Sequence, residues 1–304
     1  MASSRLRDED QIAVLEMGIS DFGEMARLTK IAKPDTCVIT NIGTCHLENL
    51  GDRDGVLKAK TEIFQSMKPN GHIVLNGDDD KLITVREYNG VKPVFFGLNS
   101  ERDVYADQIE SKGLKGVACR IHLGEDAFDV LVPTPGIHMV YNALAAAAVG
   151  RIYGLTIEEI RRGIESLETI RGRFKMIETD RFLVVDDCYN ANPMSMKASL
   201  DVLHDGEGRR VAILGDMGEL GEDEAALHEG VGIHAATCGI DACVCVGDLA
   251  VHIAEAARKA NPDFPVYYEK TRESLLEHLN DYVQKGDTIL VKASHFMKFE
   301  EVGS

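Results

Sequence analysis

The stretch F-L-V-V-D-D-C-Y-N-A-N-P-M-S-M-K, residues 182–197, indicates the fold class. Its apolar start, Phe182–Asp186, is typical of a buried strand, and further polar residues follow at once. Pro193 then begins an amphipathic run to Leu203, at the first helical position, where proline is tolerated. A strand, a polar turn and a helix in this order are the repeating unit of a parallel α/β sheet.

The same alternation continues on both sides of this stretch. Toward the C-terminus it predicts strands at Val211–Leu214, Ala242–Val246 and Thr288–Val291, with helices at Asp223–Ala236, Leu249–Lys259 and Arg272–Val283. Toward the N-terminus it predicts strands at Ile12–Leu15, Thr36–Thr40 and His72–Leu75, with helices at Phe22–Ile31 and Asp54–Met67. Both halves are therefore expected to be α/β, with mainly parallel sheets covered by helices.

Residues 91–132 break this rhythm. Shorter, antiparallel strands are expected at Phe95-Phe96, Val104–Asp107, Gly116–Leu123 and Ala127–Val132. Helices follow at Val140–Tyr153 and Thr156–Ser166, and Thr156 with Glu159 forms a capping box for the second helix. We place a domain boundary at Glu168–Gly172, which gives domains of 1–170 and 171–304.

The composition excludes several classes of function. The 304 residues include 33 basic and 50 acidic side chains, a formal charge of −17, whereas nucleic-acid and anionic-membrane surfaces need clustered cations. No apolar run approaches the roughly 20 residues of a membrane span. The start M-A-S-S-R-L-R has no apolar leader, and none of the 7 cysteines forms a C-x-x-C pair. We expect a cytoplasmic protein with buried, reduced thiols.

Three polar residues of the first half could meet at one edge of its sheet. Glu16 directly follows the first predicted strand, His46 lies a few residues beyond the second, and Lys60 lies in the next helix. Ligands bind at the carboxyl ends of parallel strands. A carboxylate, an imidazole and a lysine carbamoylated by CO2 could hold Mg²⁺ there. Taken singly, the three could equally be a solvated loop acid, a structural histidine and a solvated helix lysine.

In the second half the densest polar cluster is Asp186–Asn192. Two carboxylates and two amides between a strand and a helix suit a nucleotide, although helix capping explains Asn192 by itself. Lys292 and Ser294 follow the last predicted strand, so a cation and a hydroxyl lie at its carboxyl end. They could bind a substrate carboxylate, and ordinary surface polarity is the alternative.

Two further loops carry less chemistry. Gly215–Gly221 follows a strand, but its glycine spacing differs from that of dinucleotide loops and its two acids would repel a pyrophosphate, so we expect a structural or substrate-positioning turn. Asn76–Asp80 is expected to be a solvated turn that caps the next helix. No G-x-x-x-x-G-K-[ST] phosphate loop occurs in the chain.

Several of these motifs together resemble the Mur ligase family. They are V-L-E-M-G (14–18), N-I-G-x-x-H-L (41–47), A-K-T-E-I (59–63), the run from Gly136 through His138 and Asn142 to Ala146, D-D-x-Y-N-A-N-P (186–193), L-G-D-M-x-E-L-G (214–221) and V-K-A-S (291–294). The resemblance covers nearly the full length. It implies the later part of the family's central ATP-binding domain followed by its Rossmann-like C-terminal domain. The segments 186–193 and 214–221 most resemble the branch that adds D-alanyl-D-alanine to a UDP-N-acetylmuramoyl-tripeptide.

The resemblance implies an ATP-dependent ligase of peptidoglycan precursor synthesis. In such enzymes the tripeptide carboxylate attacks the γ-phosphate of ATP to form an acyl phosphate, and the amine of D-alanyl-D-alanine then displaces phosphate from it. The matching motifs imply that Glu16, His46 and a carbamoylated Lys60 would bind Mg²⁺. They also imply catalytic roles for His46 and Lys60. A monomer is expected. ATP would contact Asn142, Arg173, Asp187, Tyr189 and Asn190, and the second substrate would contact Asn192, Lys292 and Ser294.

The chain departs from the family pattern in three ways. The family's uridine-nucleotide-binding first domain is missing, and so is its G-T-x-G-K-T-type phosphate loop. The last motif is K-A-S-H (292–295), where the family often has K-G-S-R. We therefore expect an inactive fragment of such a ligase. The alternatives are a folylpolyglutamate synthetase-like or other Mur-type ligase and a non-catalytic nucleotide-binding module. A dehydrogenase is the weakest interpretation because of the glycine spacing.

Overall fold

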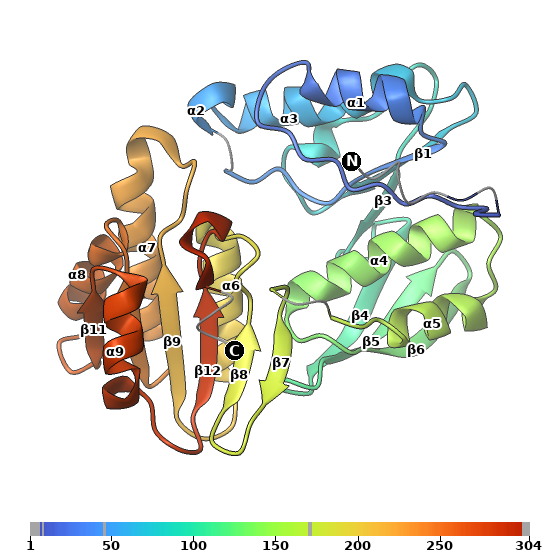
Figure 1. Ribbon diagram of the computed structural model, residues 1–304. Helices are drawn as coiled ribbons and strands as arrows, with labels where there is room; N and C mark the ends of the chain where they lie inside the picture. The colour runs from blue at the N-terminus through green and yellow to red at the C-terminus, as the bar shows by residue number, and fades with distance from the viewer. Residues whose placement is uncertain (1–6, 8, 45–46, 170–171, 300–304) are drawn as a thin grey trace.

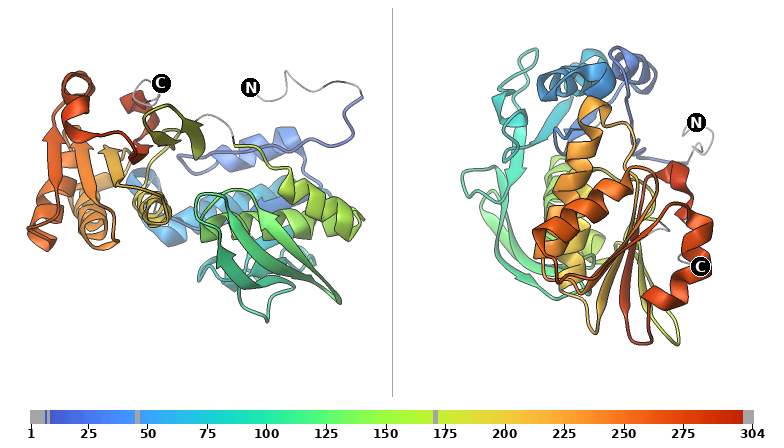
Figure 2. Two further views of the ribbon diagram at one scale, coloured as in Figure 1. Left: turned by 90° about the horizontal axis from the view of Figure 1, so that it is seen from below. Right: turned by 90° about the vertical axis from the view of Figure 1, so that its left-hand side faces the viewer.

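The computed structural model describes residues 7, 9–44, 47–169 and 172–299. These residues form two α/β units, each built on a six-stranded sheet, and the units lie side by side (Figure 1, Figure 2). The expected α/β class, with mainly parallel sheets and a smaller antiparallel part, is confirmed. No helix within these ranges is long and apolar enough to cross a bilayer.

The first unit has the strand order β1-β2-β3-β4-β5-β6. β1 to β4 are parallel neighbours, whereas β4, β5 and β6 pair in antiparallel fashion. Helix α4 packs on β2 to β5 through buried alanines, whose small side chains allow close approach. Its elements are α1 (Glu24–Ala32), β1 (Thr36–Ile39), α2 (Leu47–Leu50), α3 (Arg53–Thr61), η2 (Glu62–Ser66), β2 (His72–Asn76), η3 (Leu82–Thr84), β3 (Val94–Gly97), β4 (Val104–Ser111), β5 (Val117–Leu123), β6 (Asp126–Val132), α4 (Ile137–Ile152) and α5 (Ile157–Glu165).

The second unit has the strand order β11-β10-β9-β12-β8-β7. All of its neighbours are parallel except β7 and β8. Apolar clusters fill both faces of this sheet, as expected where helices cover both sides. Its elements are β7 (Lys175–Glu178), β8 (Leu183–Asp186), α6 (Pro193–His204), β9 (Arg210–Gly215), η4 (Gly221–Asp223), α7 (Glu224–Thr237), β10 (Ala242–Val246), α8 (Ala250–Ala260), β11 (Val266–Glu269), α9 (Arg272–Tyr282), β12 (Thr288–Lys292) and η5 (His295–Met297).

Most elements lie where periodicity predicts them, and the exceptions have physical reasons. Residues 12–15 form no strand, because this short apolar run has no partner strand to pair with, and the side chain of Val14 is 92% exposed. Phe95 lies in β3, which is parallel rather than antiparallel to its neighbours, since residues 77–93 carry the chain back before β3 begins. The edge strands β7 and β11 were not predicted, because their exposed or half-buried residues give little apolar signal.

The described cysteines behave as expected. They are all free, and all except Cys238 are buried. The sulfurs of Cys243 and Cys245 lie 3.5 Å apart on one face of β10. Burial raises the pKa of the Cys37 thiol to about 12 and that of Cys119 to about 11, so both stay protonated and unreactive near neutrality.

The two units touch through backbone and side-chain contacts. Ser111, at the end of β4, donates from Oγ to Oδ2 of Asp205 at 2.8 Å, beyond the end of α6. Gly136 precedes α4 with φ +99°, and a Cβ atom there would lie 3.0 Å from Val202 Cγ2 in α6. The start of α4 in the first unit therefore lies against the last turn of α6 in the second unit.

The crossing of α7 and α8 gives a stability prediction. A Cβ atom at Gly232 would lie 2.2 Å from the carbonyl oxygen of Ile253, so Gly232→Ala forces the helices apart and should destabilise the protein by roughly 1–3 kcal/mol. Gly163, in α5, has no atom within 4 Å of the same position. Gly163→Ala should therefore stabilise by roughly 0.5–1 kcal/mol. Urea unfolding midpoints that move in the same direction for both variants would contradict this packing.

Candidate active site

A buried ion pair joins the polar ends of two neighbouring strands in the second unit. Lys292, the last residue of β12, is 2% exposed, and its Nζ lies 2.6 Å from Asp187 Oδ2 and 3.1 Å from the carbonyl oxygen of Asn190. Ser199 in α6 donates to the same carboxylate oxygen at 2.7 Å. Two of the three ammonium hydrogens are thus used within the protein, which leaves one donor for a ligand.

The residues between Asp187 and α6 fulfil the expected capping pattern. Asn192 is the N-cap of α6: its Oδ1 accepts from the Ser195 backbone N–H at 2.8 Å, in a reciprocal capping box, with Pro193 at the first position. The side chain of Asn190 accepts from the backbone N–H of Ala191 at 2.8 Å. The amide oxygens of this segment therefore shape the turn, while Asn190 remains exposed.

An arginine links this segment to the first unit. Arg173 Nη2 lies 3.1 Å from Glu16 Oε2 and 3.3 Å from Oε1, and the two side chains come from different units. The guanidinium carbon lies 4.1 Å from the ring centroid of Tyr189, a cation–π contact. Glu16, which is expected to bind a metal, is thus brought to the edge of the expected nucleotide segment, and its carboxylate is 79% exposed.

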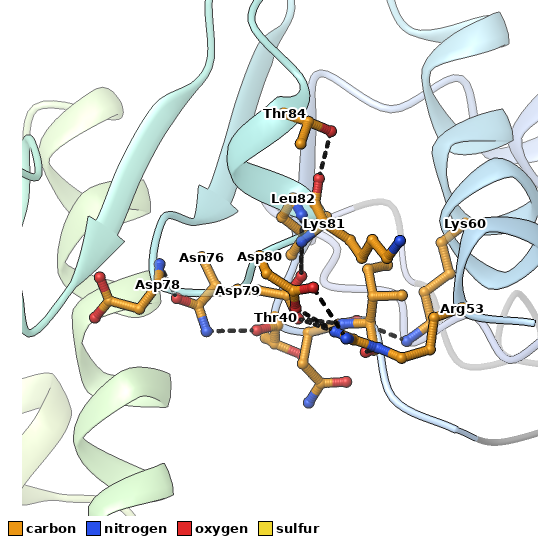
Figure 3. Close-up of polar contacts among 12 residues, drawn as sticks. Thr40, Arg53, Lys60, Asn76, Asp78, Asp79, Asp80, Lys81, Leu82 and Thr84 are labelled. Carbon is orange, nitrogen blue, oxygen red and sulfur yellow. Dashed lines mark hydrogen bonds and ion pairs between the residues drawn. The ribbon is translucent and has the colours of Figure 1, made fainter.

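Lys60 contacts the loop that follows β1 (Figure 3). Its Nζ donates to the carbonyl oxygen of Asn41 at 2.9 Å. The neighbouring carbonyls are also bound: Asn76 Nδ2 donates to Thr40 O at 3.0 Å, and Arg53 Nε donates to Ile42 O at 3.0 Å. His46 lies outside the described residues. Within the described residues, no group of three or more metal-binding side chains of His, Cys, Asp or Glu occurs.

The acids after β2 differ from the expected solvated turn. Asp79 does cap η3, because its Oδ1 accepts from the Lys81 and Leu82 backbone N–H groups, but its side chain is only 8% exposed. Asp78 accepts from Leu98 N–H at 2.5 Å, Arg102 Nε at 3.0 Å and Tyr141 Oη at 3.1 Å. The Asp78 side chain is 20% exposed, whereas that of Asp80 is 66% exposed. Asp78 and Asp79 therefore accept several hydrogen bonds from other parts of the first unit, instead of being surrounded by water.

The loop 215–221 has the structural role that its spacing suggests. The buried carboxylate of Asp216 accepts from the backbone N–H groups of Asp248, Leu249 and Ala250 at the start of α8. Burial raises the pKa of this carboxyl, and the three N–H donors oppose that shift. In the same loop, the Gly218 N–H donates to Ser294 Oγ at 3.0 Å. Ser294 is buried and thereby ties the loop after β9 to the end of β12.

His228 completes this loop and was not predicted. Its Nε2 accepts from the Met217 backbone N–H at 3.0 Å, so its Nδ1, 2.7 Å from the Glu224 carbonyl oxygen, must be the protonated nitrogen. The imidazole is fully buried, and burial lowers its pKa, although the Glu224 carbonyl acts in the opposite direction. A single histidine in an amphipathic helix gives no signal of such a role.

The buried neutral imidazole predicts a pH dependence of stability. Because the folded pKa is lowered, the unfolded chain binds the proton more readily, so stability is lost as the pH falls through the unfolded value of about 6.5. His228→Gln keeps an acceptor for the Met217 N–H and cannot titrate. The difference in urea midpoint between pH 7 and pH 5 should be smaller in this variant. An unchanged difference would show that His228 does not contribute.

His138, quoted in the motif around α4 without a role of its own, also lies near the ion pair. Burial lowers its pKa; the charge of Asp187 acts against this shift and that of Lys292 acts with it. Its Nδ1 is buried and has no hydrogen-bond partner among the residues that the structure describes. Asn142, one turn further along α4, is exposed and contacts the Met139 sulfur at 3.4 Å through Nδ2. His138 and Asn142 both lie in α4 of the first unit, and the charges of Asp187 and Lys292 in the second unit influence the pKa of His138.

Family models match both units of this fold. Residues 1–150 match the Mur ligase middle domain, and residues 172–295 match the Mur ligase glutamate ligase domain. The chain belongs to the Mur ligase family. Two curated relatives are named UDP-N-acetylmuramoyl-tripeptide--D-alanyl-D-alanine ligase. The one from Bacillus subtilis is 36% identical over 97% of this chain and 64% of its own length. The one from Escherichia coli is 34% identical over 99% of this chain and 66% of its own length.

Solved structures agree with this family assignment. A MurF structure from Acinetobacter baumannii superposes with a TM-score of 0.88 at 33% identity, over 98% of this chain and 65% of that one. A MurF ligase from Thermotoga maritima, solved in complex with ADP, gives a TM-score of 0.79 at 28% identity. This match covers 93% of the present chain and 64% of the Thermotoga maritima chain. This Mur ligase chain thus spans about two thirds of the length of the relatives that it matches.

An acidic cavity lies between the two units of this Mur ligase, and its lining includes the end of the loop 215–221 but neither Lys292 nor Asp187. It measures about 670 Å³ and lies between α2 and the residues around η4. Five of its nine lining residues are acids, so it would repel a nucleotide phosphate. The lining residues are Leu47, Glu48, Gly51, Glu219, Leu220, Gly221, Glu222, Asp223 and Glu224.

Proposed function

We propose that this chain forms the catalytic part of an ATP-dependent ligase that adds D-alanyl-D-alanine to UDP-N-acetylmuramoyl-tripeptide, acting in the cytoplasm as a monomer. The proposal rests on one arrangement: Glu16 of the first unit reaches, through Arg173, the segment in which Lys292 and Asp187 form a buried ion pair. The names of the relatives support the choice of substrates. The proposed domains are 1–170 and 171–304.

The proposed nucleotide site uses groups from both units. Asn142 and Asn190 are exposed and can donate to a nucleotide, and Tyr189 is 52% exposed. Arg173 is held by the largely exposed carboxylate of Glu16, so its guanidinium can turn to a phosphate when that carboxylate takes another partner. Asp187 is bound to Lys292, and in this proposal it orients the lysine and the following turn.

The residues fit a magnesium site as far as the structure describes them. Glu16 supplies an exposed carboxylate, the ligand type that Mg²⁺ prefers. His46 and a carbamoylated Lys60 would complete it in our proposal. When bound, Mg²⁺ would offset the charge of the phosphates that the tripeptide carboxylate must approach. In this proposal the ion pair between Glu16 and Arg173 opens when ligands bind. Glu16 then binds the cation, and Arg173 binds a phosphate.

The second substrate is proposed to bind beside the ion pair. Lys292 retains one ammonium donor, and the Ser294 hydroxyl lies in the same region, 3.4 Å from the Ala191 carbonyl oxygen. Such donors suit the carboxylate of D-alanyl-D-alanine. Asn192 caps α6 through its side-chain oxygen and directly follows Ala191, and it is proposed to contribute through its side-chain nitrogen.

A ligation assay tests the proposal. Because the chain spans about two thirds of its relatives, the assay uses a fusion that adds to the chain the part of the Bacillus subtilis relative that lies outside the match. Phosphate release from ATP should require both UDP-N-acetylmuramoyl-tripeptide and D-alanyl-D-alanine, and the chain alone should release none. A folded fusion that responds to another amine favours a different Mur-type or folylpolyglutamate synthetase-like ligase. One that binds ATP and releases no phosphate favours the non-catalytic nucleotide-binding module.

A further inference from the structure

The peptide group between Asn41 and Ile42 lies between two opposite charges. Its carbonyl oxygen accepts from the Lys60 ammonium at 2.9 Å, and its N–H donates to Asp79 Oδ2 at 2.8 Å. Both are hydrogen bonds to a charged partner, which are stronger than those between neutral groups. A flip of this peptide plane would point its oxygen at a carboxylate and its hydrogen at an ammonium. The two charges therefore fix a single orientation.

Arg53 binds the next peptide group of the loop after β1, through the carbonyl oxygen of Ile42. Its Nε donates to the Ile42 carbonyl oxygen at 3.0 Å, and its guanidinium forms two hydrogen bonds with Asp80, at 3.0 and 2.5 Å. Arg53 Nη2 also lies 3.8 Å from Asp79 Oδ2. Figure 3 shows Arg53 and Lys60 extending toward the acids that follow β2. Both backbone polar groups of Ile42 are thus bound by Asp79 and Arg53, two side chains that attract each other.

Burial makes this geometry rigid. The Asp79 side chain is 8% exposed, and the Ile42 side chain is 2% exposed within the apolar cluster of the first unit. The other Asp79 oxygen accepts from two backbone N–H groups at the start of η3, so the carboxylate cannot rotate away without losing those bonds. Such a fixed acceptor determines where the peptide, and hence the carbonyl that Lys60 binds, must lie.

We propose that Asp79 and Arg53 are positioning residues, which set the place of Lys60 by fixing the Asn41–Ile42 peptide. The sequence suggested only a solvated capping turn for Asp79 and no role for Arg53, and neither residue belongs to the proposed set of metal, nucleotide or substrate ligands. Their importance to ligation rests on the proposed function, because only there does Lys60 take part in a metal site. Their effect on Lys60 itself does not depend on that function.

Selective acylation of lysines tests this positioning on the intact chain. The chain is treated with an acetylating N-hydroxysuccinimide ester, without metal or nucleotide, and the labelling rates of Lys60 and Lys58 are compared by peptide mass spectrometry. Lys58 lies in the same helix and is exposed, so it serves as an internal reference. Lys60 should react more slowly than Lys58. In Asp79→Asn and Arg53→Met the Lys60 to Lys58 ratio should rise about 2- to 10-fold, the worth of one hydrogen bond.

Asp78→Asn is the matched control. Asp78 is also a partly buried carboxylate with three donors, in the neighbouring position, but its partners Leu98, Arg102 and Tyr141 lie outside the loop after β1. This variant should lose stability as Asp79→Asn does and leave the ratio unchanged. Arg53→Lys keeps the charge and should restore part of the slow labelling.

Two results would overturn the proposal. One is an unchanged ratio in both Asp79→Asn and Arg53→Met, each shown to be folded by its urea transition. The other is an equal rise in Asp78→Asn, which would mean that loosening the first unit in general exposes Lys60. Because the ratio is measured without ligand, either result is distinguishable from a failure of the proposed ligase activity, which the phosphate-release assay measures separately.

Discussion

Replacing Asp187 with alanine should lower the free energy of unfolding by about 3 kcal/mol, because it leaves the Lys292 ammonium buried without its counter-ion. Lys292 is 2% exposed, and the carbonyl oxygen of Asn190, 3.1 Å away, would remain as its partner. One carbonyl offsets part of the desolvation of an ammonium but does not neutralise its charge. The effect therefore lies at the lower end of what a broken buried pair costs.

The reverse replacement separates the charge from the packing. Lys292→Met removes the cation and keeps an apolar stem of similar length, and Asp187 retains the Ser199 hydroxyl and some contact with water. Lys292→Met should therefore cost less than Asp187→Ala, and the double variant should cost less than the sum of the two. Urea unfolding of the four proteins measures this. Additive effects would show that the two groups do not form a coupled pair.

Replacing Arg173 with methionine should weaken the binding of Mg-ADP about 10- to 100-fold, the worth of one hydrogen bond between charged groups. In the absence of nucleotide, Arg173 binds Glu16 and stacks on Tyr189, so it is already held at the mouth of the proposed site. Arg173→Lys keeps a charge but loses the planar donor pair, and it should recover only part of the affinity.

Isothermal titration calorimetry with Mg-ADP measures this change. Arg120→Met is the matched control, since Arg120 also pairs with a single exposed carboxylate, that of Asp129 on the antiparallel strands, at 2.9 Å. Its affinity for Mg-ADP should equal that of the parent chain. If Arg173→Met binds as tightly as Arg120→Met, the guanidinium does not contact the nucleotide.

The sequence predicts the local elements of this fold because their signals are local. A strand followed by a helix with proline at its first position is readable at Phe182–Leu203, and Asn192 is recognisable as the cap of α6. Residues 12–15 show the limit of such reading, since the same apolar pattern forms no strand where no neighbouring strand pairs with it. Pairing is a property of the whole sheet rather than of one segment.

The candidate site is less predictable, because its interactions join distant residues. Arg173 and Glu16 are 157 positions apart, and Lys292 and Asp187 are 105 positions apart. The three aspartates after Gly77 are predicted to form a solvated turn, yet the Asp79 side chain is only 8% exposed and accepts from a backbone N–H 37 residues earlier. Motifs identify the residue types of the site. The roles of Asp79 and Arg53, which bind the Ile42 backbone, can be identified only from the three-dimensional structure.

The most direct test of the central claim, that nucleotide and metal bind between the two units at Glu16 and Arg173, uses Mn²⁺ and ADP. Mn²⁺ replaces Mg²⁺ at oxygen sites and broadens nearby amide signals in the NMR spectrum of the labelled chain. The account predicts that Mn-ADP broadens most strongly the amides of Met17, Gly18, Tyr189 and Asn190. Broadening that is strongest in the acidic segment 219–224, or no broadening at millimolar Mn-ADP, would contradict it.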